Sequence, residues 1–437
     1  MYWLQIAKKR STLKRKVFFL FIFLYASRIA PADIISKPPK VLPANMVKLQ
    51  DDIIIKTEKA EELIYKRGAL YEDKKVLSYI NGIAHKMSSG VELDDTASIE
   101  IKIIRDPLVN AFAFPNGSIY VHTGALARLE NEAQLAFLLG HEISHVANKD
   151  GLYATHSHHN KTIAYKLINI ALAPTSIFFG VLGDLAQTGF ALLHITTLTG
   201  YGRDIEARAD REGILSVIKE GYDPHEAANL IEIFLKEKDK YQTGAEIFFL
   251  MNHPTNKWRI KKLRSIIAKE SKENAGTRIS ESRFLINMMT IKLYNADLNI
   301  KMDRLEHALD NISWVLDRFP GSSEAHYLAG EIARLKANDK EKLKYELNYK
   351  VWRELNKKRK KRELENIWRE EAISEYKKAI ESDKNYANAY KGLGLLYSET
   401  DDKEKALFYL DKYLMVNPRA KDRRYVRSLI MRIENSA

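Results

Sequence analysis

The sequence predicts a mainly α-helical protein: an α+β domain with a small β-sheet, followed by an α-solenoid of helical repeats. Three observations support this fold class. Apolar residues recur at helical spacing over long stretches, short regions between residues 98 and 121 have strand patterns, and the last third repeats a helix–turn–helix pattern. The 437 residues, 45% of them hydrophobic, suffice for two or three domains with their own cores.

The first domain is expected over residues 49–270, and it begins with a helical pattern that runs to Met87. Residues 98–104 alternate like a strand, and residues 110–121 indicate two short strands around a Pro-Asn-Gly turn. Residues 131–148 are rich in Ala and Leu and predict a helix.

An apolar stretch follows over residues 164–200, and it is broken by proline, aspartate, glutamine and several glycines. We therefore interpret it as a buried helix pair or a lid, with a membrane-dipping segment as the alternative.

The second domain, expected over residues 280–437, is predicted to consist of tetratricopeptide repeats. Residues 388–418 carry the large, small and proline positions of a helix–turn–helix unit of about 34 residues, and degenerate copies precede them. A charged helical insertion at about residues 338–370 interrupts the copies. Its basic run, 357–362, indicates a solvated helix face, with peripheral contact to an anionic membrane surface or an acidic partner as the alternative.

The net charge of +13 is concentrated at the N-terminus. Residues 1–32 carry seven Lys and Arg and no acid, which leaves an ordinary excess for the rest of the chain. A nucleic-acid-binding protein is therefore the weakest functional interpretation. The absence of cysteine excludes disulfides, thiolate metal sites and a cysteine nucleophile, so any metal must be held by His, Asp or Glu.

The N-terminus also has the features of an export signal. The basic cluster is followed by apolar residues 17–26, and Ala30-Pro31-Ala32 supplies small residues for cleavage before Asp33. We expect a signal peptide over residues 1–32 and a proline-marked linker over residues 33–48. A retained inner-membrane anchor is the alternative, because the apolar run can be extended to Ile29.

One segment concentrates the chemistry. His141-Glu142-Ile143-Ser144-His145 lies within the predicted helix, and residues four apart on a helix face the same side, so both imidazoles can bind one ion. Glu142 lies next to that face, where its carboxylate can take a proton from a water activated by zinc. The pattern predicts a catalytic zinc site, with a surface helix bearing two hydrogen-bonded histidines as the alternative.

A catalytic zinc needs a third protein ligand, and the candidate lies further along the chain. Glu206 and Asp210 share one helical face, so Glu206 can bind the metal while Asp210 hydrogen-bonds the distal nitrogen of a ligating histidine. A second group, His156, His158 and His159, has metal-like spacing, and we interpret it as an exposed loop.

Taken together, these motifs resemble peptidase family M48, the BepA/HtpX type of gluzincin. The resemblance covers separated motifs: His141-Glu142-x-x-His145, Arg203-x-x-Glu206-x-x-x-Asp210, residues 110–117 with Thr123-Gly124, and His253-Pro254 with Arg259. It implies a gluzincin-type metalloprotease domain with one Zn²⁺ per chain. The implied ligands are His141, His145 and Glu206, with Glu142 as general base.

The resemblance also assigns further roles. His253 would occupy the fourth zinc position and keep the enzyme latent, or would be a plain turn residue before proline, and Arg259 would stabilise the oxyanion. An extended substrate would add as a strand to Asn110, Ala111, Phe112, Ala113 and Phe114. Two positions depart from the family: Lys149-Asp150 stands where Arg-His is common, and Gly202 replaces a common Ser.

The sequence thus predicts an exported zinc metalloendopeptidase. By the resemblance it acts in the periplasm, in association with the outer membrane, on extended, misfolded or unassembled outer-membrane proteins. Its repeats would dock clients or the outer-membrane assembly machinery. Two alternatives stay open: a periplasmic chaperone or scaffold with a latent protease site, and an integral membrane protease of the HtpX kind that uses residues 17–29 and 164–200 as spans.

Overall fold

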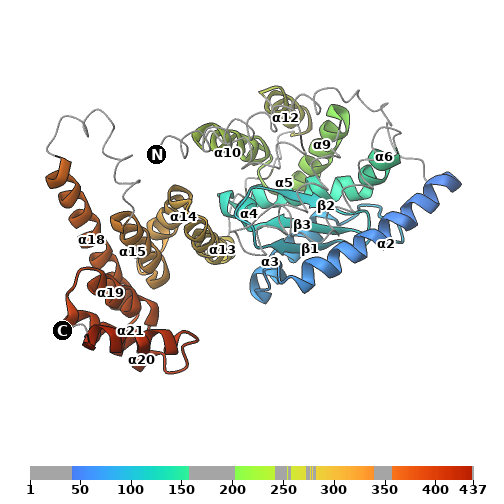
Figure 1. Cartoon of the computed structure of the whole chain (residues 1–437). Helices are drawn as coiled ribbons and strands as arrows, with labels where there is room; N and C mark the ends of the chain where they lie inside the picture. The colour runs from blue at the N-terminus through green and yellow to red at the C-terminus, as the bar shows by residue number, and fades with distance from the viewer. Residues whose placement is uncertain are drawn as a thin grey trace, which may run out of the picture. The chain divides into compact units, whose positions relative to one another are not determined.

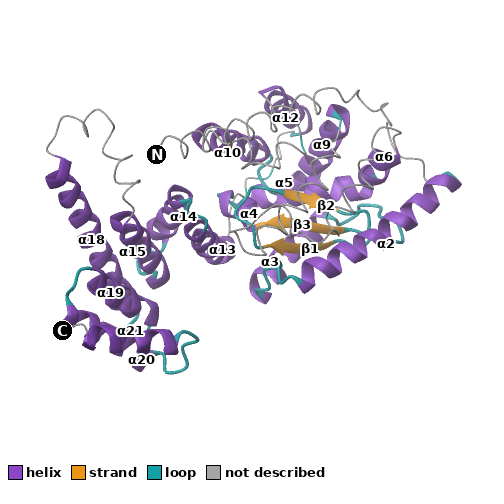
Figure 2. Cartoon of the chain, in the orientation of Figure 1, coloured by secondary structure: helices purple, strands orange, loops and turns teal. Residues whose placement is uncertain are grey.

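The computed structural model describes residues 42–156, 202–241, 253, 257–271, 276, 278, 282–338 and 357–435. The chain divides into two compact units, Met1–Leu285 and Ile286–Ala437. Helices make up most of both units, and a small three-stranded sheet lies in the first (Figure 2), which confirms the predicted fold class. The expected signal peptide, the apolar stretch 164–200, and His158 and His159 lie outside the described residues.

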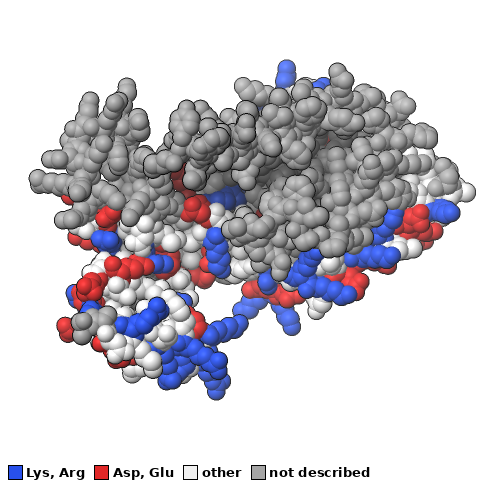
Figure 3. All heavy atoms as spheres, in the orientation of Figure 1, with Lys and Arg blue, Asp and Glu red and all other residues white. Residues whose placement is uncertain are grey.

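The first described helix, α2 (Ala44–Lys66), begins inside the predicted linker. Residues 44–48 are therefore helical, and this part of the linker prediction was wrong. Lysines and acidic residues alternate along the visible side of α2 (Figure 3), as expected for a solvated helix face. Within the described part of the chain, no helix is both long and apolar enough to cross a membrane.

A break separates α2 from α3 (Lys74–Met87), although the sequence pattern reads as continuously helical. Gly68, just after α2, has a φ of +61°, which turns the backbone out of the helix. The Asp73 carboxylate then accepts hydrogen bonds from the first free backbone N–H groups of α3. The apolar residues that recur at helical spacing along α3 are buried: Val76, Tyr79, Ile80, Ile83 and Ala84.

The sheet contains β1 (Glu100–Ile104), β2 (Ala111–Ala113) and β3 (Ser118–His122), in the order β1-β3-β2. β1 runs parallel to β3 and β2 runs antiparallel to it. All three strands lie where the sequence predicts them. Gly117, in the turn between β2 and β3, has a φ of +90°, and a Cβ there would lie 2.3 Å from the backbone oxygen of Ser98. Only glycine fits this turn.

The central helix of the first unit is α5 (Glu132–Ala147), which lies between the sheet and α9 (Arg203–Lys219) (Figure 1). The Asn131 side chain caps it by accepting a hydrogen bond from the backbone N–H of Gln134. Every residue from 132 to 146 is buried, as expected for a helix that is covered on all sides. Helices α3, α6 (Asp150–His156) and α10 (His225–Tyr241) also contact α5, and α12 (Lys257–Glu270) packs against α9 and α10. The short helix α4 (Thr123–Arg128) follows β3 directly.

Two glycines allow α5 and α9 to cross closely. A Cβ on Gly140 would lie 3.2 Å from the Cα of Gly213, and a Cβ on Gly213 would lie 3.1 Å from the backbone nitrogen of His141. Because neither residue has a side chain, the two backbones approach within contact distance. The crossing places the N-terminal half of α9 beside the His141 turn of α5.

The described residues of the second unit are mostly helical, and the unit begins slightly later than the expected domain start at residue 280. Tyr376 is buried where two glycines face it: a Cβ on Gly330 or Gly392 would lie within 2.7 Å of its ring. Small residues against a large aromatic are the packing that the repeat pattern predicts. The helices are α13 (Ser282–Lys301, which starts in the first unit), α14 (Leu305–Arg318), α15 (Ser323–Asn338), α18 (Lys357–Ser382), α19 (Ala387–Glu399), α20 (Lys403–Val416) and α21 (Arg423–Asn435).

Candidate metal centre

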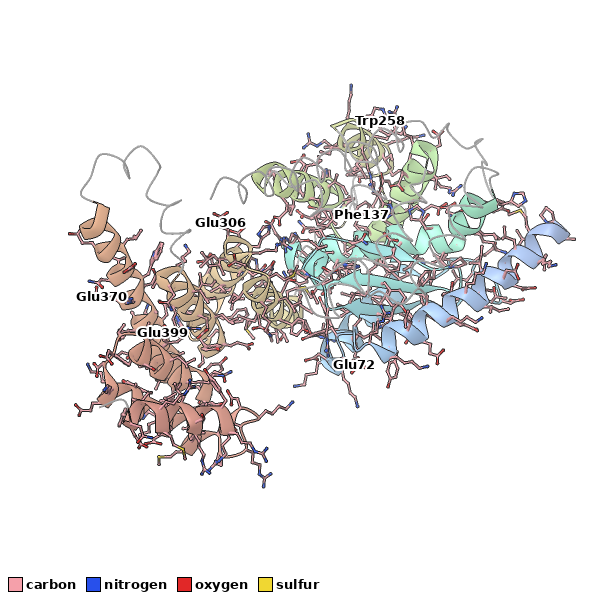
Figure 4. All side chains as sticks on the ribbon, viewed as in Figure 1. Glu72, Phe137, Trp258, Glu306, Glu370 and Glu399 are labelled. Carbon is pink, nitrogen blue, oxygen red and sulfur yellow. The ribbon has the colours of Figure 1, made fainter. Side chains whose placement is uncertain are left out.

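Helix α5 carries the zinc-binding pattern into the interior of the first unit. His141, Glu142 and His145 have exposed fractions of 0%, 1% and 2%, so the alternative of a surface helix is wrong. The two histidines lie one turn apart, and their Nε2 atoms are 3.2 Å from each other. Phe137, one turn earlier, packs with its ring centre 6.1 Å from that of His141, and it marks this part of α5 in Figure 4.

Glu206 from α9 and His253 complete a group of four buried side chains whose ligand atoms lie within 4.8 Å of one another. Nδ1 of His253 is 3.1 Å from Nε2 of His141 and 2.9 Å from Oε1 of Glu206. The Glu206 oxygens lie 3.6 Å from Nε2 of His141 and of His145. Four donors about 2.0–2.1 Å from a zinc ion at tetrahedral corners are about 3.3–3.4 Å apart. The observed spacing therefore fits a tetrahedral metal site.

The far nitrogens of the two α5 histidines both meet carboxylates. Nδ1 of His141 is 3.1 Å from Oδ1 of Asp210, and Nδ1 of His145 is 2.8 Å from Oδ2 of Asp150. A carboxylate in this position accepts the Nδ1–H of a neutral imidazole, which leaves the Nε2 lone pair directed at the centre. Two lone pairs that converge in this way are stabilised by a cation between them.

An arginine contacts each of these carboxylates. Arg259 of α12 donates to both oxygens of Asp210, at 3.0 and 2.7 Å, and its Nη1 lies 3.2 Å from Oε2 of Glu206. Arg208 of α9 forms a hydrogen-bonded ion pair with Asp150. The Arg259 side chain is buried; Trp258, its neighbour, is exposed and marks the start of α12 in Figure 4.

Burial sets the protonation behaviour of the centre. It raises the pKa of Glu142 to about 7 and also raises the pKa of Glu206. Burial lowers the pKa of His141 to about 3, which keeps this imidazole neutral and able to bind a metal. Burial also disfavours the Asp210 carboxylate, but the charge of Arg259 outweighs it and holds the pKa of Asp210 well below its usual range.

The predicted substrate strand lies at an edge of the sheet beside the same helix. Within the described ranges, β2 pairs with β3 alone, and it contacts α5. The Phe112 ring stacks on Tyr120 with the ring centres 5.3 Å apart, and the Asn110 carbonyl accepts a hydrogen bond from the backbone N–H of His122. These contacts fix one side of the strand and leave it next to the helix that carries the histidines.

The sequence does not predict the contacts that Asp150 and Arg208 make with the site. Asp150 stands out only as a departure from the family pattern, and Arg208 lies between Glu206 and Asp210 with no signal of its own. The single signal in the sequence was that an acidic residue stands where the family often has a histidine, shortly after the His145 turn.

Comparison with known proteins assigns both parts of the chain. Residues 74–267 match peptidase family M48, and residues 370–401 match a TPR repeat. The first unit contains a peptidase M48 domain. The M48 match includes all four members of the buried cluster, and the repeat match covers the second half of α18 and all of α19.

Three curated relatives illustrate the similarity. Mitochondrial metalloendopeptidase OMA1 is 31% identical to 41% of this chain in Arabidopsis thaliana and 31% identical to 38% of it in Schizosaccharomyces pombe. The β-barrel assembly-enhancing protease of Escherichia coli is 27% identical to 53% of this chain. The matches cover 33%, 45% and 46% of these relatives, so the chain spans a third to about half of their length.

The names of these relatives support a metalloendopeptidase. A solved structure of a monomeric IFIT1 mutant matches with a TM-score of 0.24 and 13% identity, over 77% of this chain and 78% of that one. These values are too low to indicate a shared fold.

Proposed function

We propose that this protein is a zinc-dependent endopeptidase whose active site is the buried centre formed by His141, His145, Glu206 and His253. The convergence of these nitrogen and oxygen donors is the observation that carries the proposal, because this donor set suits Zn²⁺. In addition, Glu142 Oε1 is buried and accepts no hydrogen bond from the described residues. A buried acceptor of this kind is satisfied by a water or a metal at the centre.

Glu142 is the proposed general base. When bound, zinc supplies Lewis acidity that polarises a peptide carbonyl and lowers the pKa of water toward about 7. Burial raises the pKa of Glu142 to about 7 in the metal-free site. Its carboxylate lies next to the metal ligands, where it can accept a proton from water and return it to the leaving amine. Its Oε1 lies 3.4 Å from Nε2 of His253, so the base borders the fourth ligand position.

Asp210 and Arg259 position the ligands in this proposal. Asp210 orients His141, and Arg259 holds both Asp210 and Glu206. The oxyanion role that the family resemblance gives to Arg259 has less support, because its guanidinium faces these two buried carboxylates. We therefore assign Arg259 a positioning role.

The substrate would be an extended or unfolded polypeptide. Residues 110–114 form or flank an edge strand beside α5, and a peptide that adds to this edge would be read mainly through its backbone. The repeats of the second unit would bind clients or partner proteins.

The proposed location is the periplasm. The signal-like residues 1–32 support export, and the relative named for enhancing β-barrel assembly supports envelope proteins as substrates. Quality control of misfolded or unassembled outer-membrane proteins is accordingly the proposed role.

His253 favours one second candidate function: a chaperone or scaffold whose protease site is latent. Its Nδ1 occupies the fourth position of the ligand set, which a catalytic zinc site leaves open for water. A His253→Ala variant separates the candidates. If His253 closes the site at rest, this variant cleaves an unfolded protein faster than the wild type does.

The test of the proposal is cleavage of unfolded casein by the purified zinc-loaded protein. His253→Ala should cleave casein, and the wild type should cleave it as well if His253 does not close the site at rest. Adding Glu142→Gln to either protein should abolish cleavage while the zinc content stays the same. A Glu142→Gln protein that cleaves at the original rate would overturn the catalytic assignment.

A further inference from the structure

Asp150 reaches His145 through a backbone turn rather than through helix geometry. Asp150 lies five residues after His145, and in a continuous helix that separation points two side chains about 140° apart. Lys149, between them, has a φ of +54°, which ends the helical path and directs the next residue back toward α5. The Lys149 side chain is fixed by an ion pair of 2.7 Å with Asp94.

Both oxygens of the Asp150 carboxylate are engaged. Oδ2 faces Nδ1 of His145 at 2.8 Å, and Oδ1 accepts from the guanidinium of Arg208. Asp150 is 2% exposed. A buried carboxylate is stable as an anion only with such partners, so the three side chains depend on one another.

The arrangement repeats the one around His141. There, a carboxylate on the far nitrogen of the imidazole is held by Arg259; here, the carboxylate of Asp150 is held by Arg208. The two sets are built from different elements, since Asp150 lies in the chain just beyond the end of α5 and Arg208 comes from the helix that also supplies Glu206.

We propose that Asp150, held by Arg208, is a positioning residue that fixes the tautomer and direction of His145 toward the metal. This inference rests on the proposed zinc centre and deepens it. Asp150 takes the Nδ1–H, so Nε2 keeps its lone pair for the ion, and Arg208 prevents the carboxylate from turning away. α9 then supports both histidines of α5, His141 through Asp210 and His145 through Arg208.

A merely structural role for Asp150 would look different. The residue begins α6, where a negative charge stabilises a helix N-terminus, and its pairing with Arg208 would join α6 to α9. Loss of these contacts would lower the stability of the metal-free protein and leave zinc affinity unchanged. Zinc affinity therefore separates the two roles.

The experiment measures the zinc dissociation constant of the purified full chain by competition with a chromogenic chelator. Asp150→Asn keeps the shape of the side chain and removes its charge, and it should weaken zinc binding about 10–100-fold. Asp95→Asn makes the same charge change at an exposed position and should leave the constant unchanged. Unaltered zinc affinity in Asp150→Asn would overturn the proposal.

His141→Ala distinguishes this failure from failure of the proposed function. Suppose that the wild type binds one zinc, that His141→Ala loses it and that Asp150→Asn has the zinc affinity of the wild type. The zinc centre is then supported, and the proposed role of Asp150 is refuted. If the wild type itself binds none, both proposals fail.

If Asp150→Asn does not fold, Arg208→Gln removes the same ion pair by changing the arginine instead. The Arg208 side chain is partly exposed, so this change is easier for the fold to tolerate. It should weaken zinc binding several-fold, and unchanged affinity would contradict the proposal. Nitrogen-15 NMR of the folded metal-free variant gives a second readout, since the Nδ1–H tautomer of His145 should lose population. An unchanged tautomer would likewise count against the role of Asp150.

Discussion

His141 and His145 lie on the same face of α5, yet they are held by different means. The support of His141 is long-range: Asp210 comes from α9, Arg259 comes from α12, and both side chains are 1% exposed. The support of His145 is partly local, because Asp150 follows the same helix after one left-handed residue. Its arginine, Arg208, has a side chain that is 16% exposed.

The difference shows that one chemical requirement can be met by two structural routes. Each histidine needs an acceptor on its far nitrogen, and each acceptor needs a cation. The His141 route depends on the packing of three helices, and the His145 route depends on a turn and one ion pair near solvent. Substitutions should therefore affect the two routes to different extents.

The largest expected effect comes from the two arginines. Arg259→Met leaves the buried Asp210 and Glu206 carboxylates without their cation and should lower the free energy of unfolding by about 3–5 kcal/mol. Arg208→Met removes a partner that is itself partly exposed, so water can replace part of the lost interaction with Asp150, and it should lower the free energy of unfolding by about 1–3 kcal/mol. Urea denaturation of the metal-free proteins measures both, and equal losses would remove the distinction between the routes.

Glu142 lies between the two histidines and should destabilise the metal-free fold at high pH. Because burial raises its pKa from 4.5 to about 7, the folded state binds a proton that the unfolded chain releases. Stability from this group is therefore full below about pH 4.5 and is lost as pH rises through about 7. Glu142→Gln should then be more stable than the wild type by on the order of 3 kcal/mol at pH 8.

Metal-free wild type and Glu142→Gln, unfolded with urea at pH 4.5 and pH 8, test this expectation. The difference in unfolding free energy should be small at the lower pH, because both side chains are then neutral. A difference that does not change between the two pH values would contradict the burial argument.

The long-range route also depends on the helix crossing. Gly213→Ala places a methyl group 3.1 Å from the His141 backbone nitrogen and should lower the free energy of unfolding by about 1–2 kcal/mol, despite the better helix propensity of alanine. Gly82→Ala is a matched control, since a Cβ there meets nothing within 4 Å, and it should stabilise α3 by about 0.5–1 kcal/mol. If Gly213→Ala stabilised the protein as Gly82→Ala does, the close crossing would be unimportant.

The smallest effect is expected at the turn of the local route. Lys149→Gly removes the strain of the positive φ, which should stabilise the protein by about 1 kcal/mol. It also removes the ion pair with Asp94, which should destabilise the protein by about 0.2–1 kcal/mol. The unfolding free energy should thus change by less than about 1 kcal/mol, with zinc affinity unaltered. A large loss of zinc affinity would show that the Lys149 side chain, rather than the turn, places Asp150.

Local patterns were enough to predict much of the fold. The helix over residues 131–148, the three strands and the repeat helices follow from periodicity, turn residues and small positions. The break at Gly68 was missed, because one glycine and an N-cap aspartate interrupt a pattern whose apolar spacing continues across them. The early start of α2 was missed because prolines dominated the interpretation of residues 33–48.

The site was predictable where its residues share a helix. His141, Glu142 and His145 are related by helical spacing, and so are Glu206 and Asp210. The contact between Asp150 and His145 has no periodic signature, because it depends on a single positive φ at Lys149. The crossing of α5 and α9 at Gly140 and Gly213 is equally invisible in one sequence, since a helical glycine does not reveal its partner.

Zinc content per chain shows whether His141, His145, Glu206 and His253 form a zinc centre. Mass spectrometry of the purified protein by inductively coupled plasma, with His141→Ala in parallel, gives this number. We expect close to one zinc per wild-type chain and almost none in the variant. No zinc in the wild type, or equal zinc in both proteins, would show that these four residues do not form a zinc centre.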